Sequence, residues 1–308
     1  MEDEIMYLPW ITYRCDFKSI DGYTSDKGWG CMIRVAQMMI WTALMRHITS
    51  QFSSSCKEKY DLTYKELKKI LLPLFLDNYG KTEAPFSIRN IIEIGDEILQ
   101  KGAGEWYGAH SISQVIRLVN DKYNQQYYKS FRILTFNEGV VYKEEINAIF
   151  DHKITQTGLL VIIPLRLGLN NIDKVYYPQI KSALSNRLSI GILGGKKSYA
   201  LYYVGYYDDY IISLDPHEVH DTVDEINNET YYSYITREPK IISLTSCDTT
   251  MAFWFYLKDQ EDAEFLYDTL EKWKQDYLDE YLIGVNDKRK LVEINDNEGE
   301  FDDDFELV

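Results

Sequence analysis

The stretch Thr24-Ser-Asp-Lys-Gly-Trp-Gly-Cys-Met-Ile-Arg34 carries the strongest structural and chemical signal in this sequence. Its first half is rich in turn and cap residues, and apolar side chains then recur at helical spacing: Met32, Val35, Met39 and Ile48. This pattern predicts a helix of about four turns that begins near Cys31. A helix N-terminus stabilises a thiolate, and its free N–H groups can hold an oxyanion. Cys31 is therefore a candidate nucleophile; the alternative is a buried structural cysteine.

A second candidate element, Leu214-Asp-Pro-His217, follows a strand pattern. Pro216 biases the residue before it towards extended backbone, where residues two apart point to the same side, about 6–7 Å apart at Cα. Asp215 and His217 are therefore expected to project towards one site. A thiolate nucleophile needs an imidazole to accept its proton and an acid to fix the imidazole tautomer. The alternative is a turn in which Asp215 caps and His217 is solvated.

A metal site is a weaker hypothesis for the same region. Asp215, His217 and His220 are potential ligands, but their spacing fits no strong metal motif, and the sequence has no CxxC pair to complete it. We therefore expect neither a metal nor a cofactor. The remaining cysteines are expected to be free thiols that pack as small hydrophobic side chains: Cys15, Cys56 and Cys247.

The composition limits the class of protein. The chain has 308 residues, 45% of them hydrophobic, with 33 Lys+Arg against 49 Asp+Glu, a formal charge of −16. The length favours one large folded domain or two ordinary ones. The acidity argues against nucleic acid or an anionic membrane as the main partner and suits a basic protein. No apolar run approaches the roughly 20 residues of a membrane span, and the acidic start resembles no signal peptide, so we expect a cytoplasmic protein.

Helical patterns dominate the first half of the chain. Capping boxes at Thr63–Glu66 and Ser111–Gln114, and a start at Ser87, predict three further helices; Pro73 limits the first of these. The buried stripe of the helix after Ser87 is expected to hold Ile88, Ile91, Ile92 and Ile98. That of the helix after Ser111 is expected to hold Val115, Ile116, Leu118 and Val119.

Strand patterns dominate the second half, before one late helix with Leu266, Leu270, Trp273 and Tyr277 on its buried face. Strands are expected at 131–135, 158–165, 188–193, 199–204, 210–214 and 250–257. Helices followed by antiparallel strands favour an α+β fold.

Six blocks of the sequence, in the same order, resemble the autophagin cysteine peptidases, which process the ubiquitin-like modifier of autophagy. The blocks are Trp10–Arg14, Thr24–Arg34, Glu105–Gly108, Ile163–Leu169, Gly194–Lys196 and Leu214–His217. The likeness covers the chain from Trp10 to about Trp273. It implies a papain-like fold with N-terminal helices and a mostly antiparallel sheet. We expect a catalytic domain over residues 1–294, with a small inserted helical subdomain around 50–105, and a tail over 295–308.

The resemblance also implies the roles of the catalytic residues. Cys31 would be the nucleophile, His217 the base and Asp215 the residue that orients the base. Tyr13 matches a tyrosine that helps to form the family's oxyanion hole. The alternative for Tyr13 is a core aromatic residue without a catalytic role.

Further matches imply substrate contacts. Trp106 matches the tryptophan that roofs the narrow groove for the substrate's C-terminal glycine, and Gly194-Gly195-Lys196 begins the loop that opens with it. Arg166 matches an arginine at the substrate surface. Each residue also has an alternative, purely structural interpretation: Arg166 could form a surface ion pair, and Trp106 could be an aromatic residue of the core. After Lys196 the family usually continues with proline, whereas this chain has Lys197, so the loop is expected to move differently.

The acidic tail, residues 295–308, is expected to be flexible and to end in a docking motif. Phe305 and Val308 have aromatic-x-x-aliphatic spacing and follow three aspartates. Such a segment can add to a sheet edge and place two side chains in hydrophobic pockets. Family members carry a similar modifier-binding motif at their C-terminus.

The resemblance thus implies a cysteine protease with a Cys-His-Asp triad. Its substrates would be the precursor of a GABARAP-type autophagy modifier, cleaved after the C-terminal glycine, and the modifier's phosphatidylethanolamine conjugate. We expect a monomer that contacts membranes only through this lipidated substrate and binds no nucleic acid. Two alternatives stay open: a non-catalytic modifier-binding protein, and a protease for a different ubiquitin-like protein.

Overall fold

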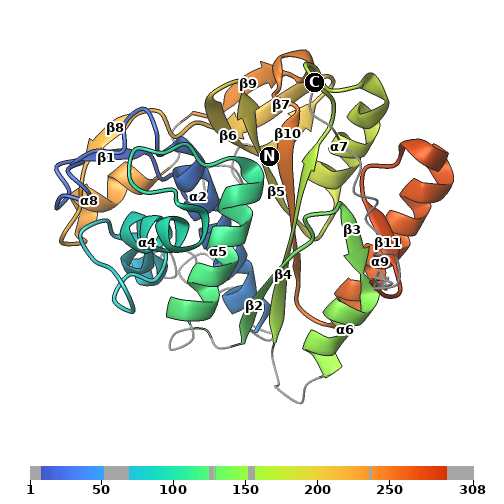
Figure 1. Ribbon diagram of the computed structural model, residues 1–308, viewed down its shortest axis with the longest axis horizontal. Helices are drawn as coiled ribbons and strands as arrows, with labels where there is room; N and C mark the ends of the chain where they lie inside the picture. Colours follow the sequence, from blue (N-terminus) through green and yellow to red (C-terminus); the bar gives the residue numbers. More distant parts are fainter. Residues whose placement is uncertain are drawn as a thin grey trace, which may run out of the picture.

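A seven-stranded sheet forms the centre of the protein (Figure 1), in the order β2-β4-β10-β5-β6-β7-β9. The computed structural model describes residues 8–51, 69–124, 128, 130–151, 157–235 and 238–289. The strands are β2 (Phe131–Thr135), β4 (Gly158–Arg166), β5 (Ser189–Lys196), β6 (Tyr199–Tyr207), β7 (Tyr210–Leu214), β9 (Lys240–Ser243) and β10 (Thr250–Leu257). Neighbouring strands are antiparallel except β2 and β4, which are parallel. The six predicted strands and the mostly antiparallel α+β architecture are confirmed.

Helices cover both faces of this sheet (Figure 1). On one face lie α2 (Cys31–Ser50), α4 (Ile88–Leu99) and α5 (Ala109–Tyr123), and on the other lie α6 (Lys143–Asp151), α7 (Tyr177–Ser185) and α9 (Gln260–Tyr277). Smaller elements are the parallel pair β1 (Tyr13–Cys15) and β8 (Val219–Asp221), the parallel pair β3 (Val140–Tyr142) and β11 (Gly284–Asn286), and α8 (Asn228–Tyr231). Short 3₁₀ helices span Leu72–Phe75, Lys174–Tyr176, Tyr232–Tyr234, Leu244–Ser246 and Leu278–Glu280.

The alternation of side chains along the central strands creates two hydrophobic cores. Strand β10 is buried on both faces, because successive residues of a strand point to opposite sides. Ala252 and Trp254 pack under α2 and α5, whereas Phe253 and Phe255 pack under α9. Successive side chains of β4 likewise point alternately into the two hydrophobic cores. Both faces of this strand are therefore apolar, which explains why its sequence shows no alternation with polar residues.

Helix α2 begins at Cys31 as predicted, and its 20 residues make it longer than the four turns expected. Ser87 caps α4, where its side chain accepts from the N–H of Asn90. The predicted stripe of α4 is correct except at Ile98, which is 36% exposed. Ile98 lies in the last turn, beyond the buried part of the helix, and Ile94 takes its expected place in the core.

The capping box predicted at Ser111–Gln114 is wrong. Helix α5 begins two residues earlier, at Ala109, with Gly108 as its N-cap. Ser111 therefore lies inside the first turn, where it cannot cap the helix. Val115, Ile116 and Val119 are buried as expected, but Leu118 is only half-buried.

Two predictions fall wholly or partly outside the described residues. The capping box at Thr63–Glu66 lies there, as does the whole tail over 295–308; Pro73 lies in a 3₁₀ helix. The inserted subdomain around 50–105 stays a prediction, although Phe75 stacks on Trp41 of α2 at 5.2 Å between ring centroids.

Among the described helices, none is both long and apolar enough to cross a membrane.

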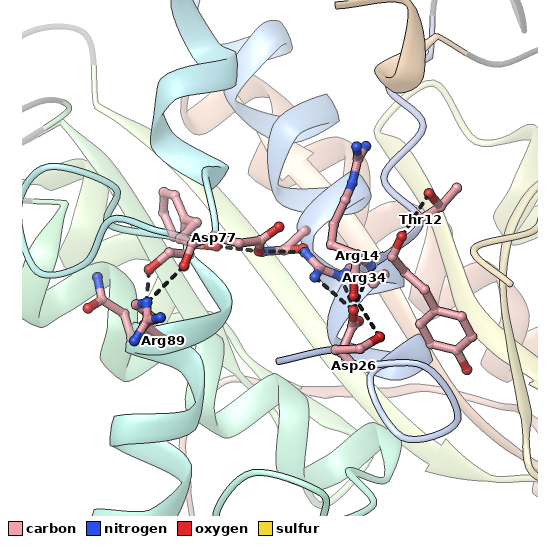
Figure 2. A network of polar contacts seen from close by, with 12 residues as sticks. Thr12, Arg14, Asp26, Arg34, Asp77 and Arg89 are labelled. Carbon is pink, nitrogen blue, oxygen red and sulfur yellow. Dashed lines mark hydrogen bonds and ion pairs between the residues drawn. The ribbon is translucent and has the colours of Figure 1, made fainter. Parts of the chain in front are cut away.

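A buried network of charges joins the helical layer to the segment before Cys31 (Figure 2). Arg34, in the first turn of α2, donates to both carboxylate oxygens of Asp26, at 2.8 and 3.0 Å, and to Asp77 Oδ1 at 2.8 Å. The Arg14 N–H of β1 donates to Asp26 Oδ1 at 2.7 Å. All three ionic side chains of the Arg34 cluster are buried. Since an unpaired buried charge is costly, these ion pairs hold the segments in register.

Arg34→Met is expected to lower the free energy of unfolding by about 3–5 kcal/mol, because it leaves two carboxylates buried without their cation. Urea unfolding followed by tryptophan fluorescence measures the loss. Arg117→Met is the matched control, since Arg117 pairs with Asp121 on the exposed face of α5. Its loss is expected to stay below about 1 kcal/mol. Equal losses in the two variants would contradict a structural role for the buried network.

Candidate active site

Cys31 is the first residue of α2 and is almost fully buried, with 1% of its surface exposed. The N-cap, Gly30, contributes no side-chain hydrogen bond, so no capping side chain occupies the first N–H groups of the helix. A Cβ on Gly30 would lie 2.2 Å from Asp26 Oδ2, so only glycine fits at this position. The buried network therefore fixes the turn that presents the thiol.

Asp215 and His217 lie together in the loop after β7, as expected from their spacing. His217 Nδ1 is 2.6 Å from Asp215 Oδ1, and the backbone N–H of His217 donates to the same oxygen at 3.0 Å. The loop is held by the segment that contains β1. Trp10 Nε1 donates to the Asp215 carbonyl at 2.8 Å, and the Tyr13 N–H donates to the Pro216 carbonyl at 2.9 Å.

The imidazole of His217 is paired with Asp215, and Cys31 is near enough to affect its pKa. Burial alone would lower the pKa of His217, but hydrogen bonds to Asp215 and Cys31 and their negative charges outweigh it and raise that pKa to about 9. Burial also opposes the ionised form of Asp215, yet hydrogen bonds from His217 and Tyr199 hold its pKa below the usual value. The site thus favours the imidazolium form of His217.

Tyr13 lies against both members of this pair. Its ring meets the ring of His217 edge-on at 5.3 Å, and Cys31 is near enough to help raise the pKa of its phenol. Burial and the nearby Cys31 sulfur raise the pKa of Tyr13, so the phenol keeps its proton. A protonated phenol at this place is a hydrogen-bond donor next to the sulfur.

Trp106 and Gly194-Gly195-Lys196 line one cavity of about 230 Å³ beside the start of α2. Met32, the residue after Cys31, lines the same cavity. Trp106 is 37% exposed and belongs to the loop between α4 and α5, so it is no core aromatic. A larger cavity of about 390 Å³ lies over the β5–β7 region, and no predicted site residue lines it.

Comparison with known proteins gives the family of the chain. The model of the peptidase C54 catalytic domain matches residues 1–269. The chain belongs to the peptidase C54 family. This is a family of cysteine peptidases with a papain-like fold, so the predicted fold class and the resemblance to the autophagins are confirmed.

Similar curated proteins of the C54 family come from animals and yeasts. Cysteine protease ATG4A of Homo sapiens is 31% identical over 288 residues, which are 83% of this chain and 70% of that protein. Cysteine protease ATG4D of Xenopus laevis is 29% identical and is covered over 66% of its length. A probable cysteine protease ATG4 of Vanderwaltozyma polyspora is 27% identical and is covered over 62%. The chain therefore spans about two thirds of the length of these relatives.

The other two cysteines that the structure describes in this C54 domain, Cys15 and Cys247, have environments that raise the pKa of their thiols. Burial and the neighbouring Asp221 carboxylate, 3.4 Å from the sulfur, raise the pKa of Cys15 to about 11. Burial likewise raises the pKa of Cys247 to about 11. Both thiols are protonated at neutral pH and are poor nucleophiles. All three described cysteines are free, and Cys56 lies outside the described residues.

The alternative of a metal site at Asp215, His217 and His220 is not supported by their geometry. His220 Nδ1 is 2.7 Å from the hydroxyl of Thr12, and its ring packs edge-on against Trp10. In the part of the chain that the structure describes, these three residues do not bring their ligand atoms within 4.8 Å of one another. Only the first two members meet, as a hydrogen-bonded pair.

Arg166 lies at the exposed end of β4. Its guanidinium donates to the carbonyls of Gly168 and Leu169 at 3.1 and 3.2 Å, which braces the loop after the strand. Thr250, the residue opposite Arg166 in the sheet, lines the cavity beside Trp106. Arg166 is therefore a neighbour of the cavity rather than one of its lining residues.

Tyr199 is the residue of this site that the sequence patterns missed. Its hydroxyl donates to Asp215 Oδ2 at 2.7 Å, and its ring stacks on that of His217. The sequence contains 26 tyrosines, and no local pattern distinguishes this one. Only the pairing of β6 with β5 and β7 brings it to the loop of Asp215.

Asp215→Asn is expected to move the alkaline limb of the pH–rate profile to lower pH. The imidazolium of His217, which faces Asp215, Cys31, Tyr13 and Tyr199, is fully present below its ordinary pKa and is lost as pH rises through about 9. Asparagine removes one of the charges that raise this pKa, and the peptidase rate is expected to fall at least about 100-fold.

The measurement is kcat/KM for cleavage of a modifier precursor between pH 5 and 10. Asp221→Asn is the matched control, because that carboxylate neighbours Cys15 instead. An unshifted alkaline limb in Asp215→Asn would show that this carboxylate does not set the charge of His217.

Proposed function

We propose that this C54 peptidase cleaves the precursor of a GABARAP-type autophagy modifier after its C-terminal glycine, and that it releases the modifier from phosphatidylethanolamine. One observation supports the proposal: the imidazole of His217 is hydrogen-bonded to the Asp215 carboxylate, and the buried Cys31 is near enough to help raise the pKa of His217. A fixed thiol, base and acid in this order are what nucleophilic acyl transfer requires.

In the proposed first step, the Cys31 thiolate attacks the carbonyl carbon of the glycine. The carbonyl oxygen becomes an oxyanion, which the Tyr13 hydroxyl and the free N–H groups at the start of α2 stabilise. The imidazolium of His217 then gives its proton to the leaving amine as the C–N bond breaks. The products are a thioester on Cys31 and a free amine.

In the second step, His217 accepts a proton from water, and the resulting hydroxide attacks the thioester carbonyl. The C–S bond breaks, and the modifier leaves with a glycine carboxylate. Asp215 holds the same nitrogen of the imidazole in both steps, so the ring presents its other nitrogen to sulfur and to water. No cofactor takes part in this scheme.

Glycine specificity has a steric origin in this proposal. The cavity beside the start of α2 is lined by Trp106, Gly194 and Gly195. A slot between an indole and glycine backbone admits an extended chain but excludes side chains. Arg166, next to this cavity, is proposed to contact the surface of the modifier.

Both substrates carry an amide on the same glycyl carbonyl. In the precursor the leaving amine is the next residue, and in the lipid conjugate it is the amine of phosphatidylethanolamine. One thioester therefore serves both reactions, and membrane contact comes through the lipidated substrate. A cytoplasmic monomer remains our prediction.

The C-terminal motif is proposed to dock the modifier at a second place. Phe305 and Val308 lie outside the described residues, so the proposal rests on their spacing and on the three aspartates before Phe305. The acidic residues would steer the segment to a basic face of the modifier.

Cys31→Ala is expected to abolish cleavage of purified precursor, because alanine offers no nucleophile. Product formation is followed by mass spectrometry, with Cys247→Ala as a matched control that keeps full activity. Cleavage by the Cys31→Ala variant would contradict the thiol mechanism and favour the alternative of a non-catalytic modifier-binding protein. A panel of ubiquitin-like precursors tests the other alternative, since preference for a different modifier would overturn the substrate assignment.

Phe305→Ala combined with Val308→Ala is expected to weaken modifier binding at least about tenfold, because the double variant lacks the two side chains proposed to enter hydrophobic pockets of the modifier. Calorimetry with the mature modifier measures the affinity. Labelling of Cys31 by iodoacetamide is expected to stay unchanged, which separates docking from chemistry. Equal affinity of the double variant and the parent would refute the docking role.

A further inference from the structure

Tyr199 touches both partners of Cys31 in the candidate triad. Its hydroxyl donates to Asp215 Oδ2 at 2.7 Å, and its ring is stacked on the ring of His217, with 3.5 Å between centroids and 7° between planes. We propose that Tyr199 is a positioning residue that holds the Asp215–His217 pair in its reactive arrangement. This inference rests on the proposed thiol peptidase function.

The hydroxyl of Tyr199 completes the hydrogen bonding of the carboxylate. Asp215 Oδ1 faces both Nδ1 and the backbone N–H of His217, at 2.6 and 3.0 Å. Oδ2 accepts from Tyr199. A carboxylate held through both oxygens cannot rotate freely, so Oδ1 stays in line with the imidazole.

The ring of Tyr199 restrains the imidazole itself. Asp215 occupies Nδ1 of His217, which leaves Nε2 as the ring nitrogen available to Cys31. Tyr199 covers one face of the ring, and Tyr13 meets it edge-on at 5.3 Å. Rotation of the imidazole about its χ2 angle would break both contacts, so the two tyrosines keep Nε2 directed at the sulfur.

The position of Tyr199 is fixed by a tight hairpin between β5 and β6. Tyr199 pairs with Lys196 across the two-residue turn Lys197–Ser198. At Gly195 the backbone has φ +153°, and a Cβ there would lie 2.1 Å from the carbonyl oxygen of Tyr199. The Tyr203 hydroxyl hydrogen-bonds to both the N–H and the carbonyl of Gly195, at 2.7 Å each. The hairpin that carries Tyr199 is therefore clamped at its base.

Tyr199 acts as a donor and does not itself take part in proton transfer. Burial and the neighbouring Asp215 carboxylate raise the pKa of its phenol, so it stays protonated throughout the working range. Substrate is not needed to form these contacts. Loss of Tyr199 should therefore change the rate of the chemical step more than the binding of the modifier.

Two variants separate the hydroxyl from the ring. Tyr199→Phe keeps the stack but removes the donor, and kcat for precursor cleavage is expected to fall about tenfold. Tyr199→Leu removes both contacts, and kcat is expected to fall about 100-fold. KM is expected to stay within about twofold in each variant. Tyr207→Phe and Tyr207→Leu are matched controls on the same strand, because Tyr207 is 68% exposed; they are expected to match the parent.

The pH profile gives a readout that a merely structural role would not move. In Tyr199→Phe the negative charge of Asp215 is no longer partly neutralised by the hydrogen bond from Tyr199. The carboxylate therefore raises the pKa of His217 further than in the parent. The other groups that face His217, Cys31 and Tyr13, are unchanged in the variant. The alkaline limb of kcat/KM in Tyr199→Phe is therefore expected to move to higher pH, opposite in direction to Asp215→Asn.

Cys31→Ala measured in parallel distinguishes the two possible failures. If Cys31→Ala retains cleavage, the proposed function fails. If Cys31→Ala is inactive while both Tyr199 variants match the parent, only the positioning role fails.

A raised KM with unchanged kcat in the Tyr199 variants would also overturn the positioning role, because Tyr199 would then contact substrate. Thermal unfolding checks that the conservative Tyr199→Phe protein is folded; an unshifted alkaline limb in that folded variant contradicts the inference.

Discussion

The buried ion pair between Arg34 and Asp26 is the constraint on which the site depends. Asp26 accepts hydrogen bonds from Nε and Nη2 of Arg34 and from the backbone N–H of Arg14, so it joins α2 to β1. The segment around β1 in turn holds the loop of Asp215 and His217 through hydrogen bonds from Trp10 and Tyr13. Because buried charges without partners are costly, loss of the Arg34–Asp26 pair is expected to disturb the segments that hold this loop.

The proposed chemistry lies where the helical layer meets the sheet. Cys31 comes from the start of α2, which packs in one hydrophobic core, and His217 follows the end of β7. Neither residue depends on a long loop for its position. A nucleophile and base carried by separate rigid elements keep their geometry, provided that the contacts between the elements are also rigid. The β5–β6 hairpin, with Tyr199 at its end, adds such a contact from the sheet.

Much of the architecture could be predicted from the sequence because the signals were local. Long apolar runs predicted β4 and β10, and helical spacing predicted the start of α2 at Cys31. The failures were also local ambiguities. Ile98 fits the helical stripe of α4 but lies beyond the packed part of the helix, and a Ser-x-x-Gln pattern inside α5 imitated a cap. Helices α6 and α7 were not predicted, because they are short.

The sequence by itself determined the chemical groups of the site: a cysteine at a helix start, and an acid and an imidazole two residues apart in extended chain. Capping and strand geometry act over a few residues, so they can be read without a fold. Only the tertiary structure decided that the acid and the imidazole form a hydrogen-bonded pair, that the thiols of Cys15 and Cys247 have raised pKa values, and that Tyr199 lies on His217. The reason is that burial, charge neighbours and ring stacking depend on residues distant in the chain, which packing alone brings together.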